Sequence, residues 1–90
     1  MSFQFDPAKA NANKRKHGVS FADAEGVFND PLSRHVEDPD APGEERFVAV
    51  GEGSAGMLLV VVYTIRYGDI RLISARKPTR WERKQYEEGK

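Results

Sequence analysis

The chain has 90 residues, a size at which a single domain with a thin apolar core is expected. It contains no cysteine, which excludes disulfide bonds, thiolate metal ligands and a cysteine nucleophile. Hydrophobic residues make up 39% and charged residues 31%, as in globular proteins. No apolar run reaches the ~18 residues of a membrane span, and the N-terminus lacks a signal-peptide core. We therefore expect one cytoplasmic domain over residues 1–90.

The charges cancel over the whole chain but not along it. Fourteen Lys and Arg residues balance fourteen Asp and Glu residues. Residues 31–56 carry two basic and six acidic groups, whereas residues 57–90 carry eight basic and four acidic groups. The basic excess near the C-terminus suggests a polyanionic partner, although a solvated surface of mixed charge is the more frequent explanation of such an excess.

The N-terminal third predicts a short strand and two helices. Phe3 and Phe5 alternate with polar residues, as in an edge strand. Asp6 before Pro7 is typical of a helix start and Gly18 of a helix stop, which predicts a helix over residues 7–17. A second short helix should begin after a serine cap. Three of its apolar residues are expected in the core: Phe21, Ala24 and Phe28.

The rest of the chain predicts four strands and a last helix. Seven consecutive apolar residues at 57–63 indicate a central strand covered on both faces. Thr79 and Glu82 form the pattern of a capping box at the start of a helix. The remaining expected elements are a polar strand at 32–38, a turn at 39–43, strands at 46–50 and 70–76, and a helix at 80–88. This order predicts an α+β fold with an antiparallel sheet of about four to five strands, two N-terminal helices and one C-terminal helix.

The pair Gly68-Asp69 predicts a two-residue hairpin turn between the last two strands. This turn would place Val61 opposite Arg76, and Arg66 opposite Arg71. Because like charges directly opposed destabilise a sheet, these two arginines should splay apart, find carboxylates or bind an anion such as phosphate. A cluster of five arginines could then hold phosphate groups: Arg66, Arg71, Arg76, Arg80 and Arg83.

The helices at 7–17 and 80–88 both lack the apolar stripe that normally anchors a helix. His17 would lie in the last turn of the first helix, where it could transfer a proton to or from a phosphodiester or simply cap helix carbonyls. Neither of the two histidines has metal-ligand spacing. We therefore expect no metal and no cofactor.

Two segments resemble the BrnT family, the ribonuclease toxins of a type II toxin–antitoxin system. The segment at 6–31 contains the family pattern D-x-x-K-x-x-x-N-x-x-K-H-G-V-x-F, and the segment at 71–88 contains I-S-A-R followed by E-x-x-x-Y. The matching residues are Asp6, Lys9, Asn13, Lys16, His17, Gly18, Val19, Phe21, Arg76, Glu82 and Tyr86. The chain departs from the pattern at Pro78, where alanine is usual, and at Trp81, where a basic residue is usual.

The resemblance implies a RelE-like fold and metal-independent endoribonuclease activity, in which the RNA 2′-hydroxyl attacks the adjacent phosphate. It also implies a cognate antitoxin with a ribbon-helix-helix domain. We predict that Arg76 stabilises the transition state and that His17 transfers a proton. Glu82 and Tyr86 would orient these groups, and Lys16 would bind phosphate. The alternative is a non-catalytic module that binds protein or RNA, and the two differ in whether these side chains converge at one concave place.

Overall fold

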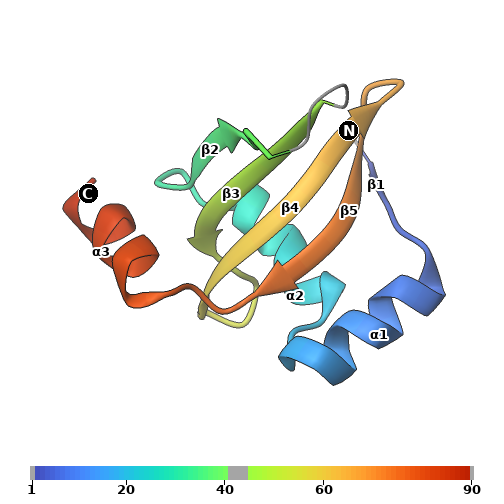
Figure 1. Cartoon of the computed structure of the whole chain (residues 1–90), viewed down its shortest axis with the longest axis horizontal. Coiled ribbons are helices and arrows are strands. Elements are labelled where there is room, and N and C mark those ends of the chain that lie inside the picture. The colour runs from blue at the N-terminus through green and yellow to red at the C-terminus, as the bar shows by residue number, and fades with distance from the viewer. Residues whose placement is uncertain (1, 41–44, 90) are drawn as a thin grey trace.

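The structure is a computed structural model that describes residues 2–40 and 45–89. Within these ranges it contains three α-helices, one 3₁₀ turn and five strands, which confirms the predicted α+β fold (Figure 1). The helices are α1 (Pro7–His17), α2 (Phe21–Glu25) and α3 (Arg80–Glu88), and the 3₁₀ turn is η1 (Gly26–Asn29). The strands are β1 (Phe3–Gln4), β2 (Arg34–Glu37), β3 (Arg46–Glu52), β4 (Leu58–Arg66) and β5 (Asp69–Arg76). The turn predicted at 39–43 lies partly outside the described residues.

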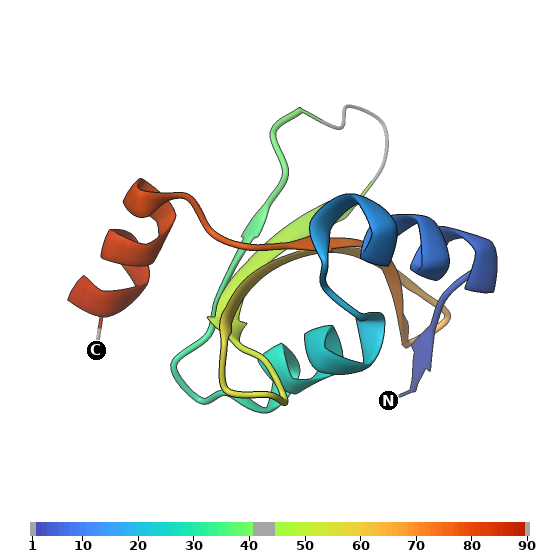
Figure 2. The ribbon, with the colours of Figure 1, turned by 90° about the horizontal axis from the view of Figure 1, so that it is seen from below.

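The five strands form one sheet in the order β1-β5-β4-β3-β2, in which only β1 runs parallel to its neighbour. The apolar strand β4 is the central strand, as predicted. Figure 2 shows that the sheet is curved, with α2 and η1 inside its concave face. None of the helices in the described ranges is long and apolar enough to cross a membrane.

The core lies between the concave face and the short helices. Leu59 and Val61 of β4 are fully buried there, beside the predicted core residues Phe21 and Ala24. Phe28 is only half-buried, because η1 turns Val27 into the core in its place. The other buried members of this cluster are Val19, Ala49, Tyr63, Ile70, Leu72 and Ala75.

The predicted hairpin register is wrong, because the two turn residues are Tyr67 and Gly68 instead of Gly68 and Asp69. Both turn residues have positive φ, 52° and 81°, which is the conformation of the two-residue turn that matches strand twist. Asp69 consequently begins β5 and pairs with Arg66. The carboxylate of Asp69 accepts hydrogen bonds from the backbone and hydroxyl of Ser2, and these bonds lower its pKa.

A β-bulge at Ile73 shifts the register again. Tyr63 pairs with Leu72 and Val62 with Ser74, so Ile73 is an extra residue in β5. Beyond it, Arg76 lies opposite Val60 and not Val61. Arg76 therefore belongs to the convex face of the sheet, because Val61 faces the core on the concave side.

The helices α1 and α3 flank the convex face at its two edges, α1 beside β5 and α3 beside β3 (Figures 1 and 2). The helix at 7–17 forms with the predicted caps: Asp6 accepts a hydrogen bond from the backbone of Ala8 at 2.9 Å, and Gly18 closes the helix at φ 72°. The strip of sheet between the two helices carries the candidate site.

Candidate active site

Arg76 lies at the end of β5, and its side chain is held by the first turn of α3. Its two terminal nitrogens donate to the two carboxylate oxygens of Glu82, each at 2.8 Å. These bonds lower the pKa of Glu82 from 4.5 to about 2, so the carboxylate is charged at neutral pH. The side chain of Arg76 nevertheless remains 36% exposed, which leaves the guanidinium accessible to a ligand.

Glu82 is itself fixed by the predicted capping box. Its carboxylate accepts a hydrogen bond from the backbone of Thr79 at 2.8 Å, and its own backbone donates to the Thr79 hydroxyl at 3.2 Å. One carboxylate thus caps α3 and holds Arg76 in place. A guanidinium bound in this bidentate way has a defined direction, as the binding of a phosphate requires.

Asn13 fixes α1 against β5. Its amide nitrogen donates to the carbonyl oxygens of Val19 at 3.0 Å and Ala75 at 2.8 Å, and its amide oxygen accepts from the N–H of Ala75 at 3.1 Å. It is the one buried residue that α1 contributes. Three hydrogen bonds from a buried amide thus replace the apolar stripe that this helix lacks.

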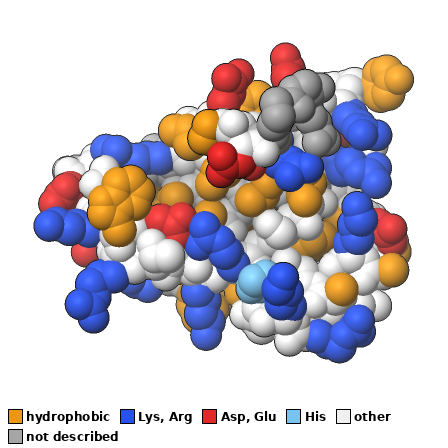
Figure 3. All heavy atoms as spheres, viewed as in Figure 1, with side chains coloured by type: hydrophobic (Ala, Val, Ile, Leu, Met, Phe, Trp, Pro, Cys, Tyr) orange, Lys and Arg blue, Asp and Glu red, His pale blue; other side chains and the backbone are white. Residues whose placement is uncertain are grey.

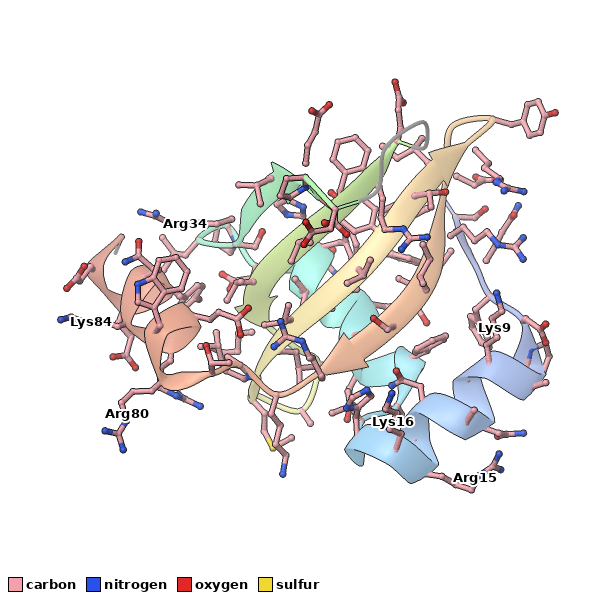
Figure 4. The ribbon with its side chains drawn as sticks, viewed as in Figure 1. Lys9, Arg15, Lys16, Arg34, Arg80 and Lys84 are labelled. Atoms are coloured by element: carbon pink, nitrogen blue, oxygen red, sulfur yellow. The ribbon has the colours of Figure 1, made fainter. Side chains whose placement is uncertain are left out.

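His17 follows Asn13 by one helical turn and therefore lies on the same side of α1. With Lys16 it borders a shallow hollow of about 220 Å³ between α1 and β5, and Ser74 forms part of the opposite wall. Figure 4 shows Lys16 between α1 and β5 and Arg15 pointing away from the sheet. The hollow is lined by Lys9, Ala12, Asn13, Lys16, His17, Ile73 and Ser74.

Ser74 connects this hollow with Arg76. The two residues lie on the same face of β5, two positions apart, which corresponds to about 7 Å along a strand. The structure thus brings His17, Lys16, Arg76 and Glu82 to one strip of the convex face, between α1 and α3. Four of the five predicted residues thus share one face of the sheet, but only His17 and Lys16 line the hollow, and Tyr86 does not join them.

Tyr86 is not part of this strip. Its hydroxyl donates to the carboxylate of Asp30 at 2.6 Å, and the same oxygen of Asp30 accepts a hydrogen bond from the backbone of Glu52 at 2.8 Å. The bond to Asp30, together with burial, raises the pKa of Tyr86 to about 12. Tyr86 therefore ties α3 to the body of the protein through Asp30.

The five arginines predicted as one cluster fall into two groups. Arg66 and Arg71 lie at the hairpin end of the sheet, where Arg66 is opposite Asp69 and Arg71 is opposite Thr64. Arg76 lies at the other end of β5, five residues and about 16 Å from Arg71. Arg80 and Arg83 belong to α3, and Arg83 forms an exposed pair with Glu87 at 3.9 Å. The direct opposition of Arg66 and Arg71 expected from the sequence is wrong.

The bulge at Ile73 places Arg71 on the same face as Arg76. Thr64, Val62 and Val60 alternate regularly toward the convex face of β4, and their partners in β5 are Arg71, Ser74 and Arg76. Without the extra residue, positions 71 and 74 would point to opposite faces. In Figure 3, basic side chains gather around this face of the molecule, with apolar side chains between them.

Two features of the strip were not predicted from the sequence. Asn13 is one of the residues that match the family pattern, but its residue type did not reveal that its amide fixes α1 against β5. The bulge at Ile73 does have a signal, because the apolar positions change from 70 and 72 to 73 and 75, but the predicted register took the strand as regular. Among the described residues, no three His, Asp or Glu side chains gather closely enough to hold a metal ion.

The chain is similar to known proteins in both sequence and fold. The family model for the ribonuclease toxin BrnT of type II toxin–antitoxin systems matches residues 5–82. A crystal structure of the Brucella abortus ribonuclease toxin BrnT has a similar fold, with a TM-score of 0.68 and 23% sequence identity over 89% of this chain and 99% of that chain. No significant match was found among curated proteins. Because the family model spans most of the chain, including α1, the strands β2 to β5 and the start of α3, the chain belongs to the BrnT family of ribonuclease toxins of type II toxin–antitoxin systems.

Proposed function

We propose that this chain is a metal-independent endoribonuclease whose active site is the strip of convex sheet between α1 and α3. The observation that carries the proposal is that His17 and Arg76, from the two ends of the chain, border the same strip of β5. In this reaction the 2′-hydroxyl of RNA attacks the adjacent phosphorus and the bond to the 5′-oxygen breaks. The products are a cyclic 2′,3′-phosphate and a free 5′-hydroxyl.

Arg76 binds the non-bridging oxygens of the reacting phosphate and stabilises the charge that develops on them. A guanidinium suits this task because its charge does not titrate near neutral pH and its paired donors match phosphate geometry. Glu82 is a positioning residue, since it holds the guanidinium through two hydrogen bonds of 2.8 Å. Such preorganised charge typically contributes about 10²–10³ in rate.

His17 is the proton-transfer group. An imidazole exchanges protons near neutral pH, and its place at the end of α1 is fixed by Gly18 on one side and by Asn13 one turn earlier. Lys16 borders the same hollow and binds phosphate there. Tyr86 acts through α3 and not on the substrate, because its hydroxyl is taken by Asp30.

The RNA backbone runs along β5 from Arg76 toward Arg71 and Arg66. Arg71 is accessible on the same face, about 16 Å away, which leaves room for a few nucleotides. Thr64 is the residue of β4 that pairs with Arg71. Its hydroxyl is buried and has no hydrogen-bond partner among the described residues. Arg80 and Arg83 lie outside this track and contribute positive charge at its end.

The partner implied by the family is an antitoxin, and we propose that it carries a ribbon-helix-helix domain. An antitoxin protein keeps such a ribonuclease inactive by binding to it. The accessible strip between α1 and α3 is a surface at which a bound antitoxin would prevent RNA from binding. The antitoxin then acts either by covering the strip or by binding beside it.

End-group analysis of the cleaved RNA tests the proposed chemistry. Purified protein is incubated with single-stranded RNA in the presence of a chelator. We expect cleavage to continue at the same rate, with products that a kinase can label at the 5′ end and that carry a cyclic phosphate at the 3′ end. Loss of cleavage on chelation, or 5′-phosphate products, would contradict the proposed mechanism. An RNA with a 2′-deoxy substitution at the cleaved position is the matched control and should resist cleavage.

A further inference from the structure

A second hollow on the convex face lies between α3 and the strands β2 and β3. It is a groove of about 230 Å³. Its floor is formed by Val36 of β2 and Val48 and Val50 of β3, and Trp81 and Gln85 of α3 form the opposite wall. We call these five residues the valine groove. None of them has a part in the proposed cleavage of RNA.

The valine groove is apolar and open to solvent. Trp81 is 68% exposed and Val36 is 60% exposed, and both line the groove. Single apolar residues at a surface are common, but a concave group of branched aliphatic side chains beside an exposed tryptophan is typical of an interaction site. Trp81 is the one tryptophan of the chain.

The charges beside the valine groove are positive. Arg34 lines it, and its guanidinium makes no ion pair or hydrogen bond with the described residues. Arg80, which precedes Trp81, is likewise unpaired in the described part of the chain, and Figure 4 shows both arginines extending from the surface around α3. The carboxylate of Glu82 faces the groove but is already engaged by Arg76. A partner segment that fits must therefore be apolar on one side and acidic at its margins.

The valine groove also adjoins the candidate active site. Glu82 lines the groove and at the same time holds Arg76. A segment seated between β2 and α3 would thus lie directly against the ion pair that positions Arg76. No comparable apolar floor exists in the hollow beside His17, where lysines and polar residues predominate.

We infer that the valine groove is the docking site of the antitoxin, and that it receives a short amphipathic segment with apolar side chains toward Val36, Val48 and Trp81 and carboxylates beside Arg34 and Arg80. The inference rests on the antitoxin part of the proposed function and is independent of how RNA is cleaved. An RNA strand would find a stacking surface in Trp81 and phosphate donors in Arg34 and Arg80, but it would leave the floor of three valines uncovered, whereas an amphipathic peptide uses both the floor and the arginines.

Trp81 provides the test, because its fluorescence reports directly on the valine groove. The purified chain is titrated with the purified antitoxin encoded beside it. We expect a blue shift of the emission on binding, as Trp81 becomes buried. Val36→Asp and Arg34→Glu should each weaken binding by about tenfold or more, since central apolar anchors and their charged neighbours dominate such interfaces. Ile65→Asp is the control, because Ile65 is also an exposed branched aliphatic residue, at 44% against 60% for Val36, but lies at the hairpin end of the sheet.

Three results would overturn the inference. The first is a complex that forms without any change in Trp81 emission, or with unchanged affinity for Val36→Asp. The second is a blue shift produced by short single-stranded RNA, which would make the groove part of the RNA site. The third is a blue shift that grows with protein concentration in the absence of antitoxin, which would indicate a second copy of the chain in the groove.

The fluorescence titration tests the docking site whether or not the chain cleaves RNA. Val36→Asp leaves α1 and Arg76 untouched, so we expect this variant to cleave RNA at the wild-type rate and to continue cleaving when antitoxin is added. If the wild-type protein cleaves no RNA, the proposed activity fails while the fluorescence titration still decides the docking site.

Discussion

The side-chain amide of Asn13 pairs with the backbone of Ala75 as a neighbouring strand would. It donates to the Ala75 carbonyl at 2.8 Å and accepts from the Ala75 N–H at 3.1 Å. In the described structure β1 pairs with β5 only at Ile70 and Arg71, so at Ala75 this edge of the sheet is met by a helix side chain in place of a strand. Both neighbours of Ala75, Ser74 and Arg76, belong to the proposed active site.

Asn13→Ala should therefore destabilise the protein and displace α1. The change leaves the buried N–H and carbonyl of Ala75 without a partner, which typically costs about 1–3 kcal/mol. We expect the free energy of unfolding, measured by urea denaturation, to fall by that amount. Asn11→Ala is the matched control, since Asn11 is exposed on the same helix and should change stability by less than about 0.5 kcal/mol. Equal effects of the two variants would contradict the role of Asn13.

The Arg76–Glu82 pair predicts a pH dependence of stability. The folded pKa of Glu82 is lowered from 4.5 to about 2, so its contribution to stability is complete above pH 4.5 and is lost as the pH falls toward 2. We expect the wild type to be more stable than Glu82→Gln near neutral pH, and this difference to shrink across that interval. Urea denaturation of both proteins at several pH values measures it.

Glu87→Gln is the control for this pH dependence. Glu87 pairs with Arg83 at 3.9 Å on the exposed side of α3, where an ion pair contributes little. The difference in stability between the wild type and Glu87→Gln should stay small and nearly constant with pH. If the difference in stability between the wild type and Glu82→Gln were also constant with pH, the charged carboxylate of Glu82 would not be stabilised by Arg76.

The hairpin turn offers a test of the strand register. Tyr67 is fully exposed and has a φ of 52°, a conformation that asparagine adopts more easily than tyrosine. Tyr67→Asn should therefore raise the free energy of unfolding by about 0.5–1 kcal/mol, and Gly68→Ala, at φ 81°, should lower it by about 1 kcal/mol. If Tyr67→Asn changed nothing, the turn would not be centred on Tyr67 and Gly68.

Local signals in the sequence predicted most of the fold. The caps Asp6, Gly18, Ser20 and Thr79 act within one helical turn, so the residue types alone placed the helix ends. The hairpin was misplaced by one residue because an exposed tyrosine is an unusual choice for a positive φ, and the pair Gly68-Asp69 looked more favourable. The bulge at Ile73 was missed because the strand at 70–76 was taken as regular, although its apolar positions shift from 70 and 72 to 73 and 75, the change of phase that an extra residue produces.

The candidate site was predictable as a set of residue types but not as an arrangement. His17 and Arg76 were selected for their chemistry and do border one strip of the sheet. Tyr86 was selected for its spacing from Glu82, but α3 presents Glu82 to Arg76 and Tyr86 to Asp30, a difference that depends on where the helix lies against the sheet. The arginines separated into two groups for the same reason, because tertiary packing decides their distances.

The track along β5 predicts how RNA binding depends on salt. Each phosphate contact that an arginine makes contributes about 0.7 to the slope of log affinity against log salt for single strands. Arg71→Ala should therefore lower the slope by about 0.7, measured by titrating a 2′-O-methyl RNA that cannot be cleaved. Arg15→Ala is the control, since Arg15 points away from the sheet (Figure 4). An unchanged slope for Arg71→Ala would exclude Arg71 from the track.

The rate of RNA cleavage by His17→Ala and Arg76→Ala tests the proposed active site most directly. Under single-turnover conditions with chelator present, we expect each variant to lose about 10²–10⁴ in rate, and Arg76→Lys to lose most of that amount because lysine cannot bind phosphate through paired donors. Arg15→Ala, on the outer side of α1, should cleave at the wild-type rate, and circular dichroism should show all four variants folded. Wild-type rates in both His17→Ala and Arg76→Ala would contradict the assignment of the active site to the strip between α1 and α3.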